Sequence, residues 1–591
     1  MIRPVLVLVG LLGGALLLAP AELLEGFSLG SGDSVALVLR SQKQIGFAVG
    51  ALAVLSWCLV AVAVRRMQTL DDEDWRWWCG PQTPLPAWRE VALWGAVAAG
   101  LVLATDGPSL VWHDFETDDF TLLNADDELP LRELLLRTHN DHTIPLLRLE
   151  LRCWRSLFGT HSFAFACAAM GIQTSLLWST AILLRMHAVS RAAILFGLLL
   201  MSGWTLWGQF TSGAFILQKY LQISICGVLS AVCWLSWRRT GRPIYGLALL
   251  AATLWSCSLN VIGFWVPCAV LTVAACEWLN PRPAIDRRIG LGWLAGLAAL
   301  TVGLACAHAW IYSLPGNSAL LSSGGARPTL VRLATHLGVL LSTTLISTII
   351  PTPHHLAKLN LLAPTLIAVG LAAVAALLWA VRSTPRHRPA LAACVCIALG
   401  IGAMVCVGRP MEVVSTTLPA KYLGPLYVWI CCIAALVFDS AVARSVGGRQ
   451  IFVMKLGCLF IGCSWAAHGA LCAAHWVNMP FFTRDVSRVS QWCWHARTRQ
   501  AIDDLRLRFA QPVERLDPPP RSLPEVPGER LCRAYPALVY PWGEEPPLST
   551  FRCVLFRRPA AWTFSTGDQP PDPQVVELIR GDPLLSLLLV P

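Results

Sequence analysis

Two short runs of ionisable residues in this chain have the composition of a proton-transfer site. Asp118 and Asp119 stand side by side, and a run of histidine, asparagine, aspartate and histidine extends from His139 to His142. A carboxylate in such a run can accept the proton of an attacking hydroxyl group as a general base. The candidate catalytic residues are therefore Asp118, Asp119 and Asp141, and the candidate substrate-binding residues beside them are His139, Asn140 and His142.

A third run, from Gly408 to Tyr422, supplies positive charge. Arg409 and Lys421 can neutralise a departing phosphate, because charge-assisted hydrogen bonds to phosphate oxygens are strong. Arg148 is a secondary candidate for the same contact, and Tyr422 completes the candidate substrate-binding residues. A general base together with phosphate-binding cations provides the catalytic groups needed to transfer a sugar from a lipid phosphate.

The composition decides which solvent surrounds these residues. The chain of 591 residues is 55% hydrophobic and 14% charged, whereas a soluble domain is about a quarter charged. A helix needs roughly 20 apolar residues to span a bilayer, and such runs recur until about Ala474. The sequence therefore predicts an all-α, polytopic membrane protein.

We predict about thirteen transmembrane helices, some of them short or interrupted. The clear spans are Ile45 to Val64, Ser162 to Leu184, Leu221 to Trp237, Leu291 to Tyr312, Leu362 to Val381, Ala390 to Val407, Tyr422 to Val442 and Leu456 to Ala474. The weaker spans are Pro4 to Pro20, Val91 to Thr105, Ala192 to Gly208, Ile244 to Leu259 and Val261 to Cys276. The first of these weaker spans also has the features of a cleaved signal peptide.

Basic residues predict the orientation, because arginines and lysines next to spans tend to stay in the cytoplasm. The clusters fall on alternating loops: Arg65 and Arg66; Arg185 and Arg191; Arg238, Arg239 and Arg242; Arg282, Arg287 and Arg288; Arg382, Arg386 and Arg388; Arg444 and Arg449. The alternation requires Leu333 to Ile350 to be re-entrant or interfacial. These clusters account for much of the net charge of +10, so the charge implies no nucleic acid.

This orientation divides the chain into four regions. They are the N-terminal spans (1–105), an external acidic loop (106–161), a transmembrane helix bundle (162–474) and a small α+β external C-terminal domain (475–591). In the last region we expect a helix from Asp485 to Phe509 and at most one disulfide among Cys493, Cys532 and Cys553. The expected location is the plasma (inner) membrane, with multiple passes and an external C-terminus.

The acidic loop ends in an amphipathic segment. Leu147, Leu151, Trp154 and Phe158 share one helical face, while Arg148, Arg152 and Arg155 share another. This pattern predicts an interfacial helix that lies flat on the membrane. Within the same loop the run Asp126-Asp127-Glu128 has the ordinary character of a solvated surface, and we leave it out of the candidate site.

The loop resembles the first external loop of polytopic GT-C glycosyltransferases, which use polyprenyl-phosphate sugars. The resemblance rests on Phe115 to Phe120 with its Asp pair, on His139 to Pro145 running into the Arg148 helix, and on the later Gly408-Arg409 and Lys421-Tyr422 loop. It implies a multi-span fold with interfacial helices and a catalytic acid at Asp118 or Asp119. It also implies transfer of a sugar to an acceptor on the outer face, with inversion at the anomeric carbon.

Several alternatives stay open. His139, Asp141 and His142 are residue types that also ligate a divalent metal, although no cofactor is certain. The expected partners are a polyprenyl-phosphate-linked sugar donor, a glycan, lipid or protein acceptor, and membrane lipids. A multi-span transporter of a small solute or lipid would have a similar composition, and so would a structural membrane assembly protein.

Overall fold

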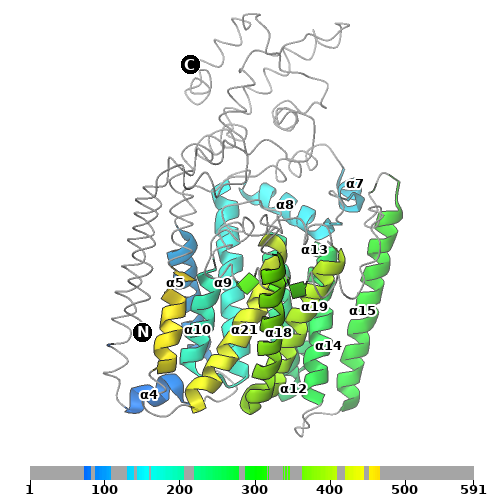
Figure 1. The fold of residues 1–591 in the computed structure, drawn as a ribbon. Helices are drawn as coiled ribbons and strands as arrows, with labels where there is room; N and C mark the ends of the chain where they lie inside the picture. The colour runs from blue at the N-terminus through cyan, green and yellow to red at the C-terminus, as the bar shows by residue number, and fades with distance from the viewer. Residues whose placement is uncertain are drawn as a thin grey trace, which may run out of the picture.

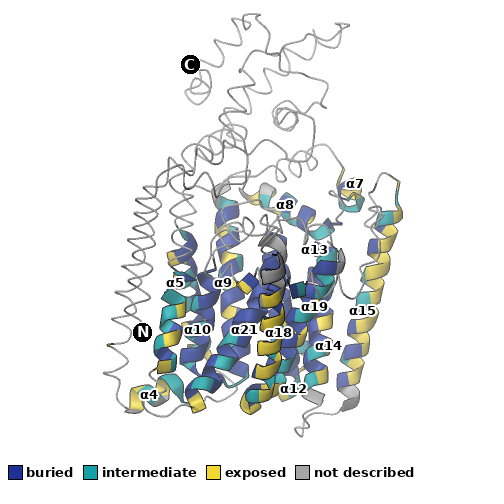
Figure 2. Ribbon diagram, viewed as in Figure 1, coloured by how far each residue is buried: buried dark blue, intermediate teal, exposed yellow. Residues whose placement is uncertain are grey.

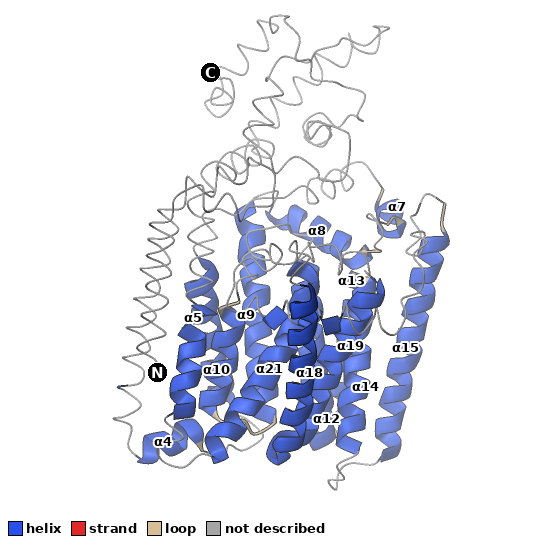
Figure 3. Cartoon of the chain, viewed as in Figure 1, coloured by secondary structure: helices blue, strands red, loops and turns tan. Residues whose placement is uncertain are grey.

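The computed structural model of the chain describes its helical bundle. The described residues are 65, 72–80, 87–107, 130–138, 143–158, 162–204, 218–278, 287–315, 317, 337–338, 340–341, 344–345, 363–408, 420–444, 452–462 and 464–465. Every regular element among them is a helix (Figure 3).

The labelled elements run in the following chain order (Figure 1). They are α4 (Asp72–Cys79), α5 (Trp88–Asp106), α7 (Leu131–Leu136), α8 (Pro145–Phe158), α9 (Ser162–Met186), α10 (Arg191–Ser202), α12 (Gln218–Thr240), α13 (Pro243–Leu259), η3 (Val261–Phe264), α14 (Trp265–Trp278), α15 (Arg287–Ser313), α18 (Ala363–Ser383), η4 (Pro385–His387), α19 (Arg388–Gly408) and α21 (Ala420–Arg444).

Six of the described helices are long and apolar enough to cross a membrane. They are Trp88–Asp106, Ala164–Met186, Gln218–Thr240, Gly290–Ser313, Pro385–Cys406 and Leu423–Arg444. Shorter apolar helices accompany them at Arg191–Ser202, Pro243–Leu259, Val261–Cys276, Gly370–Ser383 and Phe452–Gly462. The chain is thus an integral, multi-pass membrane protein, and each of these helices overlaps a predicted span.

Other sequence predictions fall outside the described residues. These include the spans Pro4 to Pro20 and Ile45 to Val64, the helix from Asp485 to Phe509 and the three tail cysteines. The count of about thirteen spans, the four-region division and the external C-terminal domain therefore stay predictions. In the expected re-entrant segment, Gly338 lies against Gly370 of α18, where an added Cβ would stand 2.1 Å from the Gly338 carbonyl oxygen.

The long helices form an antiparallel bundle around α12 and α21, which are largely buried, while α15 and α18 expose much of their surface (Figure 2). Trp204 stacks on Tyr427 with ring centroids 4.4 Å apart, and the Tyr427 hydroxyl donates to the Leu200 carbonyl oxygen at 3.0 Å. Glycines leave room for large aromatic side chains of neighbouring helices. An added Cβ at Gly227 would stand 2.0 Å from the Trp265 ring. Aromatic packing of this kind holds helices together where lipid removes the hydrophobic driving force.

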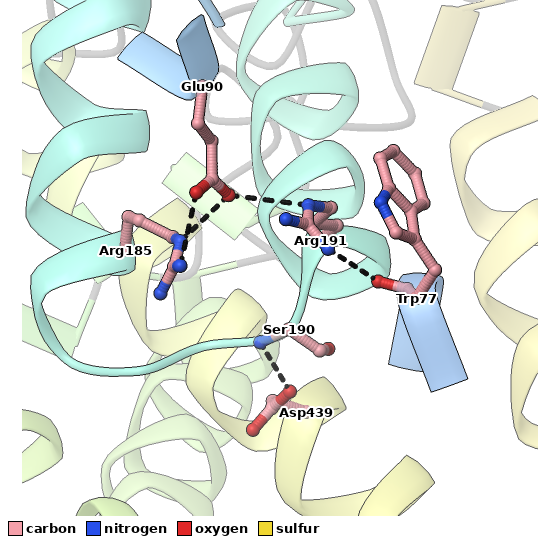
Figure 4. Close-up of polar contacts among 6 residues, drawn as sticks. All are labelled: Trp77, Glu90, Arg185, Ser190, Arg191 and Asp439. Carbon is pink, nitrogen blue, oxygen red and sulfur yellow. Dashed lines mark hydrogen bonds and ion pairs between the residues drawn. The ribbon is translucent and has the colours of Figure 1, made fainter. Parts of the chain in front are cut away.

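Ion pairs close one end of the bundle (Figure 4). Arg185 of α9 holds the Glu90 carboxylate of α5 with two bonds, at 2.8 and 3.1 Å, and Arg191 Nε lies 3.3 Å from the same carboxylate. Arg191 also donates to the Trp77 carbonyl oxygen at 2.9 Å and lies 4.2 Å above its ring. One carboxylate thereby connects α4, α5, α9 and α10.

Asp439 of α21 forms a second polar cluster at the same end. Its carboxylate accepts the Ser190 backbone N–H at 2.9 Å and lies 2.7 Å from His387 Nε2 and 3.8 Å from Arg386 Nη1. Arg386 in turn reaches the Ala188 carbonyl oxygen. Two arginine-rich turns that the sequence assigns to the cytoplasm, one with Arg185 and Arg191 and one with Arg386, therefore meet at one end, which we call the arginine end.

Candidate functional site

The opposite end of the bundle carries the elements of the predicted site. Figure 1 shows α8 lying across this end, where α9 and α12 begin and where α13 and α15 finish. Gln218, the first residue of α12, donates to the Phe165 carbonyl oxygen of α9 at 3.1 Å. We call this the α8 end.

The predicted interfacial helix is present as α8, and its apolar face points into the protein. Leu147 and Leu151 are buried, and the Trp154 ring lies 6.3 Å from that of Phe165. The helix is anchored by these side chains because their burial removes apolar surface from water. Its axis therefore runs across the bundle end rather than through the bundle.

Arg148 is buried, with only 3% of the residue exposed, although the amphipathic pattern puts it on the polar face of the interfacial helix. Its guanidinium donates to the Leu134 carbonyl oxygen and, at 3.4 Å, to that of Thr138. The last carbonyls of a helix lack partners within the helix, and an arginine can supply them. Arg148 thus caps the short helix α7, and a phosphate contact by this residue stays a prediction.

The candidate run from His139 to His142 lies outside the described residues, but both residues that flank it are fixed. Thr138 donates its backbone N–H to Asn317 Oδ1 at 3.0 Å, and Thr143 donates its own to the Tyr312 hydroxyl at 3.3 Å. Both partners belong to the final turns of α15 or follow them directly. Both flanking residues therefore lie at the α8 end.

The second half of the predicted site is placed through α21. Lys421 and Tyr422 are part of the first turn of this helix, although their side chains are outside the described residues. Tyr427 packs beside Trp204, just after α10, whereas Asp439 contacts Ser190, just before α10. Because α10 and α21 run antiparallel, the start of α21 is at the α8 end.

The remaining predicted residues follow or precede described helices. Arg409 comes directly after α19, and Asp118 and Asp119 lie between α5 and α7; all three are outside the described residues. The structure therefore brings together the described flanks of the site, and it describes the side chain of Arg148 alone among the predicted residues. Within the described part of the chain, no group of three metal-ligating side chains occurs. The run from His139 to His142 is not in that part, so this finding does not apply to it.

Two carboxylates at this end were not part of the predicted site. Asp106, the last residue of α5, is 2% exposed and accepts hydrogen bonds from Thr105 Oγ1 at 2.8 Å and Gln173 Nε2 at 2.9 Å. The sequence signal was an acid directly at the end of an apolar run. An ionisable residue inside a membrane bundle is a functional candidate by default.

Glu150 of α8 is the second carboxylate. Its Oε2 accepts from Gln222 Nε2 at 2.8 Å, and the Trp255 indole donates to Gln222 Oε1 at 2.9 Å. The other oxygen, Oε1, is shielded from solvent with no hydrogen-bond partner among the described residues. Burial raises the pKa of the Glu150 carboxyl to about 7, although the bond from Gln222 acts in the opposite direction.

This pKa predicts a pH-dependent stability. The folded state binds the Glu150 proton more tightly than the unfolded state, whose ordinary pKa is 4.5. Stability is therefore greatest below that value and decreases as pH rises towards about 7. We expect Glu150→Gln to raise the thermal unfolding midpoint at about pH 8 but not at about pH 5, when each is compared with wild type. An equal shift at both pH values would contradict this assignment.

The structure is similar to that of ArnT. The crystal structure of ArnT from Cupriavidus metallidurans, with undecaprenyl phosphate bound, aligns with 13% sequence identity and a TM-score of 0.42. The alignment covers 85% of this chain and 89% of that chain. No protein-family model and no curated protein matches the sequence. A TM-score this low transfers neither residues nor activity, so a function must come from this chain's own residues.

Proposed function

We propose that the chain is a membrane glycosyltransferase that moves a sugar from a polyprenyl-phosphate donor to an acceptor on the non-cytoplasmic face. The proposal takes the acid pair, the histidine run and the late basic loop as parts of one site. It assigns the general base to an aspartate and expects inversion at the anomeric carbon.

One observation carries the proposal. Described residues that lead towards the three candidate segments lie at the α8 end: Asp106 at the end of α5, upstream of the acid pair, Thr138 and Thr143 around the histidine run, and the first turn of α21 at Lys421. The arginine end is opposite, and basic ends of membrane helices face the cytoplasm. This arrangement supports a site in which acids and cations from distant parts of the chain share the non-cytoplasmic rim.

The proposed reaction is a single displacement. Asp118 or Asp119, with Asp141 nearby in sequence, takes the proton from the acceptor hydroxyl, whose oxygen forms a bond to the anomeric carbon. The bond from that carbon to the phosphate oxygen breaks, and polyprenyl phosphate leaves with the electron pair. Arg409 and Lys421 balance the negative charge of the leaving phosphate. Attack opposite the leaving group inverts the anomeric carbon.

The experiment that tests the proposal uses the full chain in lipid nanodiscs. Polyprenyl-phosphate sugars are supplied with candidate acceptors, and the lipid products are separated by mass. The expected result is conversion of one lipid-linked sugar to free polyprenyl phosphate with a glycosylated acceptor of inverted anomeric configuration. If no lipid-linked sugar is consumed under any of these conditions, the proposed enzyme function is wrong and a transporter function is favoured instead.

A further inference from the structure

Asn317 binds two separate parts of the chain just beyond α15. Its Oδ1 accepts the Thr138 backbone N–H at 3.0 Å, and its Nδ2 donates to the carbonyl oxygens of Leu136 at 2.8 Å and Ile311 at 2.7 Å. The amide therefore satisfies the open carbonyl at the end of α7 and one in the last turn of α15. It joins the end of α7 to the end of α15.

His308 makes a second connection from within α15, about one turn before Tyr312. The buried ring bridges the Thr143 hydroxyl at Nδ1 and the Cys257 carbonyl oxygen of α13 at Nε2, the latter at 2.8 Å. A carbonyl can only accept, so Nε2 carries the proton, and in the neutral ring Nδ1 accepts from the Thr143 hydroxyl. The edge-to-face contact with Phe264, at 5.5 Å, fixes the ring plane.

Tyr312 completes the set by accepting the Thr143 backbone N–H through its hydroxyl at 3.3 Å. The two threonines thus receive contacts from three side chains of one helix end. His308, Tyr312 and Asn317 lie well over a hundred positions along the chain from their threonine partners, with separations of 165, 169 and 179. Such contacts attach the flanks of a short run to a helix that is distant in the sequence.

The location of these side chains argues against a purely packing role. α15 stands at the edge of the bundle and leaves Gly296 and Gly303 facing open space. His308 is buried, and Tyr312 and Asn317 are half-buried. Burying polar groups is costly unless each finds a partner, and an edge helix could have used apolar residues instead. The polar groups of His308, Tyr312 and Asn317 are directed at the two threonines that flank the candidate run.

We infer that His308, Tyr312 and Asn317 form a positioning clamp that sets where the run from His139 to His142 starts and ends relative to the substrate. The inference rests on the proposed function and deepens it. The three residues do not touch the reacting atoms in this account. They act through Thr138 and Thr143, so a loose clamp should slow transfer without weakening donor binding.

The clamp can be tested without any activity by hydrogen exchange. The variants are Asn317→Ala and Tyr312→Phe, the second being a mild change that removes only the hydroxyl. Ser313→Ala is the matched control, because among the described residues its hydroxyl bonds only to the Trp310 carbonyl oxygen within the same turn. We expect the amide of Thr138 in Asn317→Ala, and that of Thr143 in Tyr312→Phe, to exchange roughly five- to tenfold faster than in wild type.

Kinetics then separate positioning from simple stability. In both clamp variants we expect kcat for sugar transfer to fall by roughly tenfold or more while the KM for the lipid donor stays near that of wild type. Ser313→Ala should match wild type in both constants. Unchanged exchange at the two threonines would overturn the inference, and so would faster exchange with an unchanged kcat.

The two proposals fail in different ways. If wild-type protein transfers no sugar, the proposed function is wrong, and the exchange measurement alone judges whether the clamp holds its two threonines. If wild type is active and Tyr312→Phe is as active and as protected as Ser313→Ala, the clamp is wrong while the proposed function stands.

Discussion

Replacing Asp118 and Asp119 together by asparagine is expected to lower sugar transfer by at least about a hundredfold, since general base catalysis contributes roughly that factor or more. Asparagine keeps the size and polarity of the side chain but cannot accept the hydroxyl proton. The rate of lipid-linked sugar consumption is measured in nanodiscs at saturating donor and acceptor. Expression and the thermal unfolding midpoint should stay at wild-type values, because the change is nearly isosteric.

The same loop offers a matched control for this substitution. Asp126 and Asp127 form a second acid pair that the sequence assigns to solvated surface. Changing both to asparagine removes the same charge from the same loop, so an effect of charge alone would appear equally in the two double variants. Full activity of the Asp118 and Asp119 double variant would show that the base has been assigned to the wrong acids.

Glu90→Ala is expected to have the largest effect on stability. The side chain of Arg185 is 3% exposed, so removal of Glu90 leaves a buried guanidinium without its carboxylate. Breaking a buried pair in this way typically costs about 3–5 kcal/mol of unfolding free energy. Arg191 loses its carboxylate contact as well, which loosens α4 and α10 from α5. The unfolding midpoint in detergent measures the loss.

Two comparisons separate the ion pair from general effects. Glu73→Ala, on the exposed surface of α4, removes an acid at the same end and should be nearly neutral. Replacing Glu90 and Arg185 together by methionine should recover much of the lost stability, because a buried pair exchanged for apolar side chains is often close to neutral. A loss for Glu90→Ala no larger than that for Glu73→Ala would contradict the role given to this cluster.

The apolar helices could be predicted from the sequence because hydropathy is a local property. The predicted span from Ser162 to Leu184 corresponds to α9, which ends at Met186, and the amphipathic pattern around Arg148 corresponds to α8. A membrane helix satisfies its own backbone hydrogen bonds, so a run of apolar residues is enough to specify it. The position of each helix along the sequence could therefore be predicted without knowing which helices pack against it.

The partners of the polar side chains could not be predicted in this way. Periodicity places Arg148 on a polar face, yet the structure buries it against carbonyls of α7, a helix too short for a pattern to reveal. Glu90 and Arg185 are separated by 95 positions, and only the arginine carried a sequence signal, for orientation. Such contacts depend on which helices become neighbours, and a single sequence does not state this.

The candidate catalytic acids illustrate the same division. Their residue types point to proton transfer, and Asp118 and Asp119 stay a prediction because they lie outside the described residues. The anchoring of Thr138 and Thr143 by α15 had no sequence signal, since Asn317 and His308 are single polar residues in ordinary surroundings. The residue types therefore predicted the chemistry of the candidate site, whereas the positions of the residues around it required the folded structure.

The most direct test of the shared rim is the sidedness of its segments in the full chain. A short epitope is inserted after Thr121, after Ser415 and, as the control at the arginine end, after Gly241, and antibody access is measured in sealed right-side-out vesicles. The account predicts that the first two epitopes are bound without permeabilisation and that the third is bound only after it. Epitopes after Thr121 and Ser415 on opposite sides of the membrane would contradict it.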